Sequence, residues 1–277
     1  MLAVALALAA SVSWGVGDFV GGLKSRVLHV LVVLAVSQLV GFAFVLAWLA
    51  LSGDAYPGTA VLATAAAAGV GGCVGLAALY RGMAVGAMGI VAPISAVAAV
   101  IPFTVGVVRG ERPGALQLAG IVLALAGVAL ASRQPAEHGG GRAAGVGLAL
   151  LAALGFGLYF VFLDEAAEQS VPWAVATARG TSSILALAAM LAAGMSLRPA
   201  AGSLGALAAV GICDVGANVL FGLASTRGLL SIVSVLAALY PIVTVGLAAL
   251  LLHERIAPAQ RVGVAGALAG AAMITAG

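Results

Sequence analysis

The chain has 277 residues, of which 64% are hydrophobic and 8% are charged, and its formal net charge is +3. Soluble domains carry about a quarter charged residues, so this composition excludes a water-soluble domain and predicts an all-α integral membrane protein. The few basic residues form no patch, and we expect no binding to nucleic acid. Cys73 and Cys213 both lie in apolar runs and are interpreted as small buried residues rather than a disulfide.

Ten segments of the sequence are apolar and about 20 residues long, which is the length that a helix needs to cross a bilayer. Because hydrocarbon offers no partners to free backbone groups, and the runs are rich in Ala, Leu, Val and Gly, we expect helices rather than barrel strands. The apolar start has no basic region before it, so it is interpreted as the first span and not as a signal peptide. The predicted spans are 2–22, 28–51, 58–80, 86–108, 113–132, 144–163, 172–195, 203–225, 229–252 and 258–276.

Three prolines, Pro93, Pro102 and Pro241, lie inside predicted spans. Proline removes a helical hydrogen bond, so we expect the spans 86–108 and 229–252 to bend. A bend beside a cavity exposes backbone carbonyls to a ligand, but bends also occur where nothing binds. The sequence leaves both interpretations open.

The sequence contains an internal repeat, in which an apolar run, a Glu-Arg corner and a Gly-rich run recur after about 142 residues. Each half holds five predicted spans, an odd number, so the second half enters the membrane from the opposite side. The predicted fold is therefore ten transmembrane helices arranged as two inverted five-helix repeats. The first repeat covers residues 1–132, a linker covers 133–143, and the second repeat covers 144–277. The clearest matches are Glu111 with Glu254, Arg112 with Arg255, Gln117 with Gln260, and Gly120 with Gly263.

These motifs resemble those of the EamA branch of the drug/metabolite transporter superfamily. The residues that carry the resemblance are Trp14–Phe19, Pro93, Glu111-Arg112-Pro113, Gly120–Gly127, Tyr240-Pro241, Glu254-Arg255 and Gly263–Gly270. The resemblance covers nearly the whole chain and implies a bacterial permease built from two five-helix halves. Its motifs are mostly glycine, proline and small residues, so it implies no particular substrate.

The orientation of the chain in the membrane is not decided by the sequence. Basic residues are more numerous in the loops that follow odd-numbered spans, and the positive-inside rule then places both termini outside the cell. The resemblance implies instead that both termini are in the cytoplasm. The two criteria disagree, and the orientation stays open.

Few polar residues lie deep in the predicted spans, and such residues are candidates for function because a membrane makes them costly. Asp214 lies in the middle of the span 203–225, and Asn218 follows four residues later on the same helix face. Arg179 lies in the neighbouring antiparallel span, at a depth within about one helical turn of Asp214. Two compatible interpretations follow: a structural ion pair, and a place on the transport path. Asp214 is also a candidate for proton coupling or for contact with a substrate amine.

Further candidates are polar or aromatic residues in other spans. Gln38 lies at nearly the repeat-equivalent position of Arg179, and either contacts a substrate carboxylate or bonds to a neighbouring helix. Tyr80, Tyr159 and Tyr240 place phenols near the inner turns of their spans, which suits a cavity for an amphipathic small molecule. Taken alone, a tyrosine in such a position more often packs than contacts a ligand.

Ser11, Trp14 and Asp18 share one face of the first span. Trp14 is deep enough to line a cavity, although tryptophan at a membrane boundary also serves as an anchor. Asp18 is one turn from the end of the predicted span, and we expect it at the interface beside Lys24 or Arg26. We expect the corners at Glu111-Arg112 and Glu254-Arg255 to cap helix ends.

Together these features predict a secondary transporter, an exporter of small metabolites such as amino acids or related amphipathic compounds, that works by alternating access as a single chain. We expect it in the plasma (inner) membrane of a bacterium, with the small-molecule substrate and the lipid bilayer as its partners. The sequence shows no nucleotide-binding motif, so we expect no cofactor, and the energy comes from a proton gradient, another ion gradient or the substrate's own gradient. The candidates for the substrate path are Trp14, Gln38, Tyr159, Arg179, Asp214, Asn218 and Tyr240.

Two other functions compete with transport. An intramembrane lipid-modifying enzyme needs a cluster of carboxylates, a His/Asp pair or a nucleophile with its base. The three histidines lie in loops or at span ends without an acidic cluster, which argues against an enzyme. A non-transporting membrane sensor is the remaining alternative, and the inverted repeat favours a carrier over it.

Overall fold

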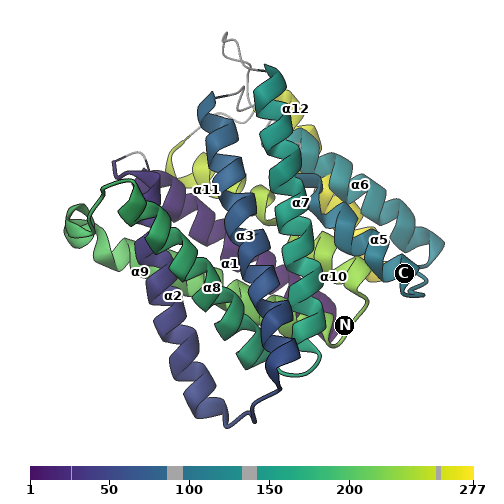
Figure 1. Ribbon diagram of the computed structural model, residues 1–277. Coiled ribbons are helices and arrows are strands. Elements are labelled where there is room, and N and C mark those ends of the chain that lie inside the picture. The colour runs from purple at the N-terminus through teal and green to yellow at the C-terminus, as the bar shows by residue number, and fades with distance from the viewer. Residues whose placement is uncertain (26, 86–95, 133–141, 254–256) are drawn as a thin grey trace.

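The computed structural model describes residues 1–25, 27–85, 96–132, 142–253 and 257–277. These ranges form helices and connecting loops and contain no β-strand (Figure 1). Two elements are short 3-10 helices, η1 (Ala96–Ala99) and η2 (Arg198–Ser203). The α-helices are α1 (Leu2–Ser25), α2 (Val30–Ser52), α3 (Thr59–Val85), α5 (Val100–Val108), α6 (Ala115–Ala131), α7 (Arg142–Ala167), α8 (Val171–Ala192), α9 (Leu204–Ser225), α10 (Leu230–Ala237), α11 (Tyr240–Leu251) and α12 (Pro258–Ala276).

Seven helical segments within the described ranges are long and apolar enough to cross a membrane. They are Leu2–Ser25, Val30–Ser52, Thr59–Leu79, Val146–Ala167, Val171–Ala192, Ala200–Ser225 and Leu230–Leu251. The fourth predicted span is described only in part, because residues 86–95, with Pro93, lie outside the described residues. The corner at Glu254-Arg255 and most of the predicted linker also lie outside them. The count of ten spans therefore stays a prediction.

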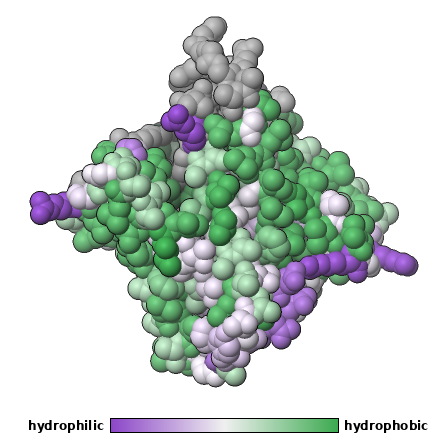
Figure 2. Space-filling model, viewed as in Figure 1, coloured by the Kyte–Doolittle hydropathy of each residue, from purple (hydrophilic) through white to green (hydrophobic). Residues whose placement is uncertain are grey.

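The outer sides of the bundle are apolar. Phe44, Val122 and Ile184 are among the large hydrophobic side chains that are exposed along the helices. Figure 2 shows hydrophobic residues over most of the visible sides, with hydrophilic residues gathered near the edges. An apolar surface this extensive would be unstable in water, and it is the surface that a bilayer requires.

Helices of the first half of the chain pack mainly against helices of the second half. α1 lies along α9, α2 along α8, α3 along α7, and α6 along α12 (Figure 1). Small residues allow these close approaches, as the sequence predicts for the run Gly263–Gly270. A Cβ atom on Gly127 would clash with the backbone of Ala267, and one on Gly270 would clash with that of Ala124. Larger side chains at these positions would force α6 and α12 apart.

The ninth predicted span is broken, as its proline predicts. α10 ends at Ala237 and α11 begins at Tyr240, with Pro241 in its first turn. Proline is tolerated there because the first turn of a helix has no partner for its backbone N–H groups. Pro102 is buried within α5. The break exposes a new helix end inside the bundle, beside the cavity described below.

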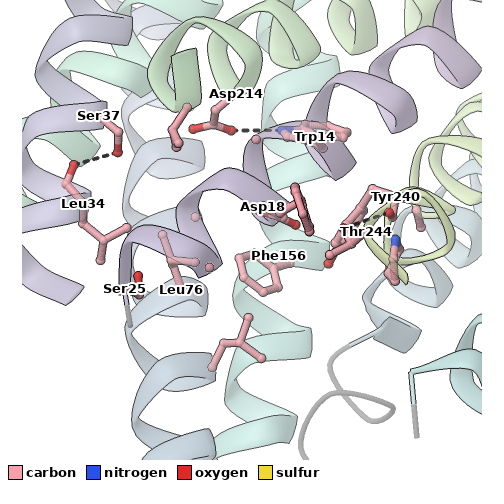
Figure 3. A pocket seen from close by; sticks show the side chains of 18 of the residues that line it. Trp14, Asp18, Ser25, Leu34, Ser37, Leu76, Phe156, Asp214, Tyr240 and Thr244 are labelled. Carbon is pink, nitrogen blue, oxygen red and sulfur yellow. Dashed lines mark hydrogen bonds between the residues drawn. The ribbon is translucent and has the colours of Figure 1, made fainter. Parts of the chain in front are cut away.

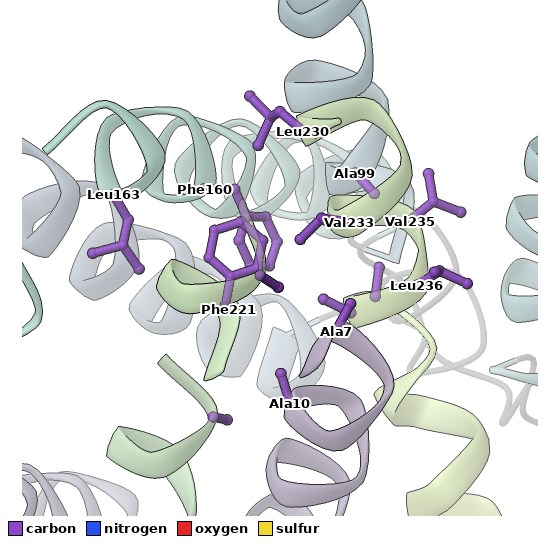
Figure 4. Packing of buried hydrophobic residues seen from close by; sticks show 14 of the residues in the cluster. Ala7, Ala10, Ala99, Phe160, Leu163, Phe221, Leu230, Val233, Val235 and Leu236 are labelled. Atoms are coloured by element: carbon purple, nitrogen blue, oxygen red, sulfur yellow. The ribbon is translucent and has the colours of Figure 1, made fainter. Parts of the chain in front are cut away.

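The helices alternate in direction, so the bundle has two ends with different contents. The end that carries the connections 53–58, 109–114, 168–170 and 226–229 is called the closed end. We call the open end the one at which α1 ends and α2 begins. Between the closed end and the middle of the bundle lies a dense apolar core (Figure 4), in which Ala7, Leu163, Phe221 and Leu236 are 0% exposed. The other half contains a cavity and, beside it, a smaller apolar cluster that includes Val33, Met190 and Leu207.

Candidate functional site

A cavity of about 780 Å³ runs from the middle of the bundle to the open end. It is bounded near that end by Ser25 and Leu252, and it reaches no further toward the closed end than Trp14 and Asn218. This volume suits a small organic molecule, since ligand pockets measure roughly 300–1,000 Å³. The side chains with polar atoms at its walls are Trp14, Asp18, Ser25, Ser37, Gln38, Cys73, Ser132, Tyr159, Arg179, Ser182, Asp214, Asn218, Tyr240, Thr244 and Gln260.

A charged network lies at the wall of the cavity, halfway through the bundle. Arg179 Nη1 donates to Asp214 Oδ2 at 2.6 Å, which forms an ion pair between α8 and α9. The same nitrogen donates to Gln38 Oε1 of α2. Trp14 of α1 donates its indole Nε1–H to the second oxygen of Asp214 at 3.0 Å (Figure 3). Four helices, two from each half of the chain, thus meet at one carboxylate and one guanidinium.

The local sequence explains why these four helices come so close. A Cβ atom on Gly41 of α2 would lie 2.8 Å from the carbonyl oxygen of Gly211, and one on Gly211 would clash with the carbonyl of Ser37. Glycine at both positions lets α2 and α9 touch backbone to backbone one turn from Gln38 and Asp214. Ser183 of α8 then donates to the backbone carbonyl of Gln38 at 3.0 Å and fixes the register of α2 against α8.

The inner end of the cavity has an aromatic floor. Trp14 packs edge-on against Phe160, with ring centroids 5.6 Å apart, and against Tyr240, with centroids 6.4 Å apart. Phe160 in turn stacks on Phe221 at 4.8 Å and contacts Tyr159 at 5.7 Å. These rings separate the cavity from the apolar core of the closed end. They offer π faces to whatever occupies the space, since the indole N–H of Trp14 is already bonded to Asp214.

The structure brings all seven residues predicted for the substrate path to this one cavity: Trp14, Gln38, Tyr159, Arg179, Asp214, Asn218 and Tyr240. The ion pair between Asp214 and Arg179 is present, as their similar depths predict. Asn218 is buried, 4% exposed, one turn below Asp214. Ser11 is also buried but does not line the cavity. The side chain of Tyr80 lies outside the described residues.

The prediction for Asp18 is wrong. The sequence placed it at the membrane interface beside Lys24 or Arg26, whereas its side chain lines the cavity and is exposed there. Arg26 lies outside the described residues. The reason is that α1 continues to Ser25, three residues beyond the predicted end, which places Asp18 deeper than its sequence position indicated.

Several wall residues were not singled out from the sequence. Ser182 donates to Gln38 Oε1 at 3.0 Å and completes the polar network. Thr244 donates to the backbone carbonyl of Gly15 or of Tyr240, each at 3.2 Å. Phe156 adds another ring to the wall. A serine or threonine in an apolar span often bonds its own helix, so no sequence signal separates these residues from packing residues.

Three polar contacts join the two halves of the chain at the closed end. Glu111 accepts the backbone N–H groups of Leu230 and Ser231, at 2.6 and 2.8 Å, and so caps the first turn of α10. The capping role predicted for the Glu111 corner is therefore present, but the capped helix belongs to the other half. Arg109 forms ion pairs with Asp164 at 3.2 Å and with Glu165 at 3.0 Å.

The third contact joins the loop after α2 to the start of α8. Ser170 donates its hydroxyl to Asp54 Oδ2 at 2.6 Å, and the indole N–H of Trp173 donates to the carbonyl of Asp54 at 3.2 Å. Ser170 is also the N-cap of α8, since its hydroxyl accepts the N–H of Trp173. The closed end is therefore held by side chains that cap helices as well as by ion pairs.

Apolar outer sides, long helices and a central polar cavity together define an integral, multi-pass membrane protein. The family model of the EamA-like transporter family matches residues 1–133 and again residues 143–276, and the chain belongs to this family. Members of this family are membrane transporters rather than enzymes.

The fold is also found among solved structures, of which 25 chains match. One of them, described only as "Crystal structure of protein", has a TM-score of 0.83 and 18% sequence identity. The match covers 99% of this chain and 96% of that chain, so the two share the fold over their whole lengths. A search of curated proteins finds no match.

Proposed function

We propose that this chain is a secondary transporter that exports small metabolites, such as amino acids or related amphipathic compounds, by alternating access. The observation that carries the proposal is the cavity, which reaches the open end and stops at an aromatic floor. A carrier must present its site to one side of the membrane at a time. A packed core and polar contacts between the two halves block this cavity on one side. This is the form expected of a carrier whose site is open to the other side only.

We further propose ten membrane helices arranged as two inverted five-helix repeats, with residues 1–132 and 144–277 as the repeats and 133–143 as the linker. Two glycine contacts support this arrangement. A Cβ atom on Gly15 would clash with Val243 and the carbonyl of Tyr240. One on Gly157 would clash with Ile101 and the carbonyl of Ala98. Gly15, Val243 and Tyr240 of the first contact correspond to Gly157, Ile101 and Ala98 of the second, and the two members of each pair are about 142 positions apart. Two equivalent halves that pack against each other symmetrically would produce this correspondence.

The substrate path, in this proposal, runs past the seven predicted residues at the cavity wall. Asp214 and Arg179 hold the four central helices together and present polar atoms to the cavity. Transport draws on a proton gradient, another ion gradient or the substrate's own gradient. The protein acts as a single chain in the plasma (inner) membrane of a bacterium, since the cavity is lined by both halves of one chain.

The test is a transport screen with purified protein in liposomes, against amino acids, polyamines, sugars and cationic dyes, with and without a pH gradient. We expect one class to be carried by the wild type and lost in Asp214→Asn, while Glu168→Gln, an exposed change at the closed end, keeps it. Asp214→Glu, which keeps the charge, and a thermal unfolding curve separate lost transport from lost folding. Equal rates with and without the pH gradient would exclude proton coupling, and a chain that carries nothing would contradict the proposal.

A further inference from the structure

One carboxylate in the cavity, that of Asp18, does not take part in the packing of the helices. Asp18 lies in α1 one turn beyond Trp14, and its side chain is exposed although its helix is one of the seven long apolar segments. Figure 3 shows it on the cavity side of α1, in the space that Phe156 and Tyr240 also line. Among the described residues it makes no hydrogen bond and no ion pair. A carboxylate placed this way is costly in a membrane, and such residues mark substrate or ion pathways.

The charges of the cavity wall leave Asp18 uncompensated. Three charged side chains line the cavity among the described residues: Asp18, Arg179 and Asp214. Arg179 is paired with Asp214 at 2.6 Å, so these two charges cancel. With Asp18 ionised, the described wall carries a net charge of about −1, located at Asp18. A field of this sign attracts cations into the cavity and repels anions.

The surroundings of Asp18 suit an organic cation rather than a small metal ion. Metal ions require several oxygen, nitrogen or sulfur ligands, and no group of three His, Cys, Asp or Glu side chains gathers anywhere in the described part of the chain. The walls next to Asp18 are instead aromatic, with Phe156 and Tyr240 lining the same space. Aromatic faces attract ammonium groups and bury apolar bodies.

We propose that Asp18 binds the ammonium group of a monovalent organic cation whose aromatic or apolar body lies against these rings, so that the substrates are amines with a net positive charge. This inference rests on the proposed transport function and narrows its substrate class. An anionic or zwitterionic substrate would need a cation to pair with its carboxylate. Nη1 of Arg179 bonds to Asp214 and Gln38, the charge of Arg179 is balanced by Asp214, and the remaining charge at the wall is negative.

The test uses three compounds that share one phenyl body and differ in charge. They are 2-phenylethylamine, phenylalanine and 3-phenylpropionate, and their uptake and binding are measured with purified protein in liposomes. We expect the wild type to favour the amine by about tenfold, because a hydrogen bond to a charged group contributes enough for one decade of affinity. Asp18→Asn should lose this preference, Asp18→Glu should retain part of it, and Glu168→Gln should behave as the wild type.

The outcomes separate the two proposals. Uptake of phenylalanine or 3-phenylpropionate at or above the rate of the amine overturns the inference and leaves transport intact. Unchanged preference for the amine in Asp18→Asn overturns the role of Asp18. If the wild type binds none of the three, the inference fails as stated, and the wider screen above then decides the transport function. The wild-type comparison needs no variant, so a folding defect in Asp18→Asn cannot obscure it.

Discussion

The middle of the bundle and its closed end both join the two halves of the chain, but they do so with bonds of different strength. In the middle, Arg179 (5% exposed) and Asp214 (32% exposed) of the second half form an ion pair, and Gln38 and Trp14 of the first half bond to it. At the closed end, Arg109 is 41% exposed, and of its two partners Glu165 is 52% and Asp164 is 7% exposed. The exposed pair with Glu165 contributes little, because water can solvate its separated charges.

The middle of the bundle is therefore held together firmly, whereas the contacts of the closed end can separate. Separating Arg179 from Asp214 would leave a charge without a partner at low dielectric, which is costly. Separating Arg109 from Glu165 costs much less, because both side chains are exposed to water, whereas Asp164 is 7% exposed and would lose its partner in a buried place. In the proposed alternating access, the contacts of the closed end would break and re-form while the central network stays intact.

The largest effect is expected at the centre. Asp214→Ala should lower the free energy of unfolding by about 3 kcal/mol, because it leaves the guanidinium of Arg179 buried and unpaired. Arg179→Ala should cost less, since the carboxylate that it leaves behind is 32% exposed and can be hydrated. Thermal or denaturant unfolding in detergent measures both. If the two variants lose the same free energy of unfolding, Arg179 and Asp214 are buried to the same extent, which would contradict the structure.

An intermediate effect is expected at Glu111. Glu111→Gln removes a charge that accepts two backbone N–H groups at the start of α10, and one of those donors is then left unpaired. We expect a loss of roughly 1–2 kcal/mol, the usual range for a charge-assisted helix cap. Hydrogen exchange at Leu230 and Ser231 should become faster. Arg112→Gln, at the exposed neighbouring residue, is the matched control and should leave that exchange unchanged.

Much of the fold could be predicted because the membrane imposes it. Apolar runs of about 20 residues fix where helices lie, and the helices α1, α2 and α9 begin and end within three residues of their predicted spans. The pairing of Asp214 with Arg179 could be predicted because both lie at one depth in adjacent antiparallel spans. For Gln38, the repeat showed a position equivalent to that of Arg179 but did not show that the two side chains would bond.

The sequence could not show which helix face meets the cavity. Asp18 looked like an interface residue because depth along a helix was the only coordinate available, whereas in the structure its side chain lines the cavity. Glu111 was expected to cap a helix, but its bond to α10 joins residues 119 and 120 positions apart. Partners at such separations depend on how the halves pack, and no local pattern encodes that.

A smaller effect on stability is expected at Arg109. Arg109→Gln should lower the free energy of unfolding by about 1 kcal/mol, because Arg109 is 41% exposed although its partner Asp164 is 7% exposed. It should nevertheless favour opening of the closed end. A cysteine at Ser234, which is 0% exposed beneath that end, reports the opening by its rate of maleimide labelling. In a background without Cys73 and Cys213, the rate should rise severalfold, and an unchanged rate would show that Arg109 does not hold the end closed.

The smallest effect is expected from the same change of charge at the open end. Lys24→Gln removes one positive charge, as Arg109→Gln does, but Lys24 lies in the last turn of α1, away from the closed end. Surface substitutions of this kind change stability by less than about 0.5 kcal/mol, and labelling of the cysteine at position 234 should stay at the wild-type rate. If Lys24→Gln accelerates labelling as much as Arg109→Gln, the net charge of the protein controls the opening. If only Arg109→Gln does so, the contacts of Arg109 with Asp164 and Glu165 control it.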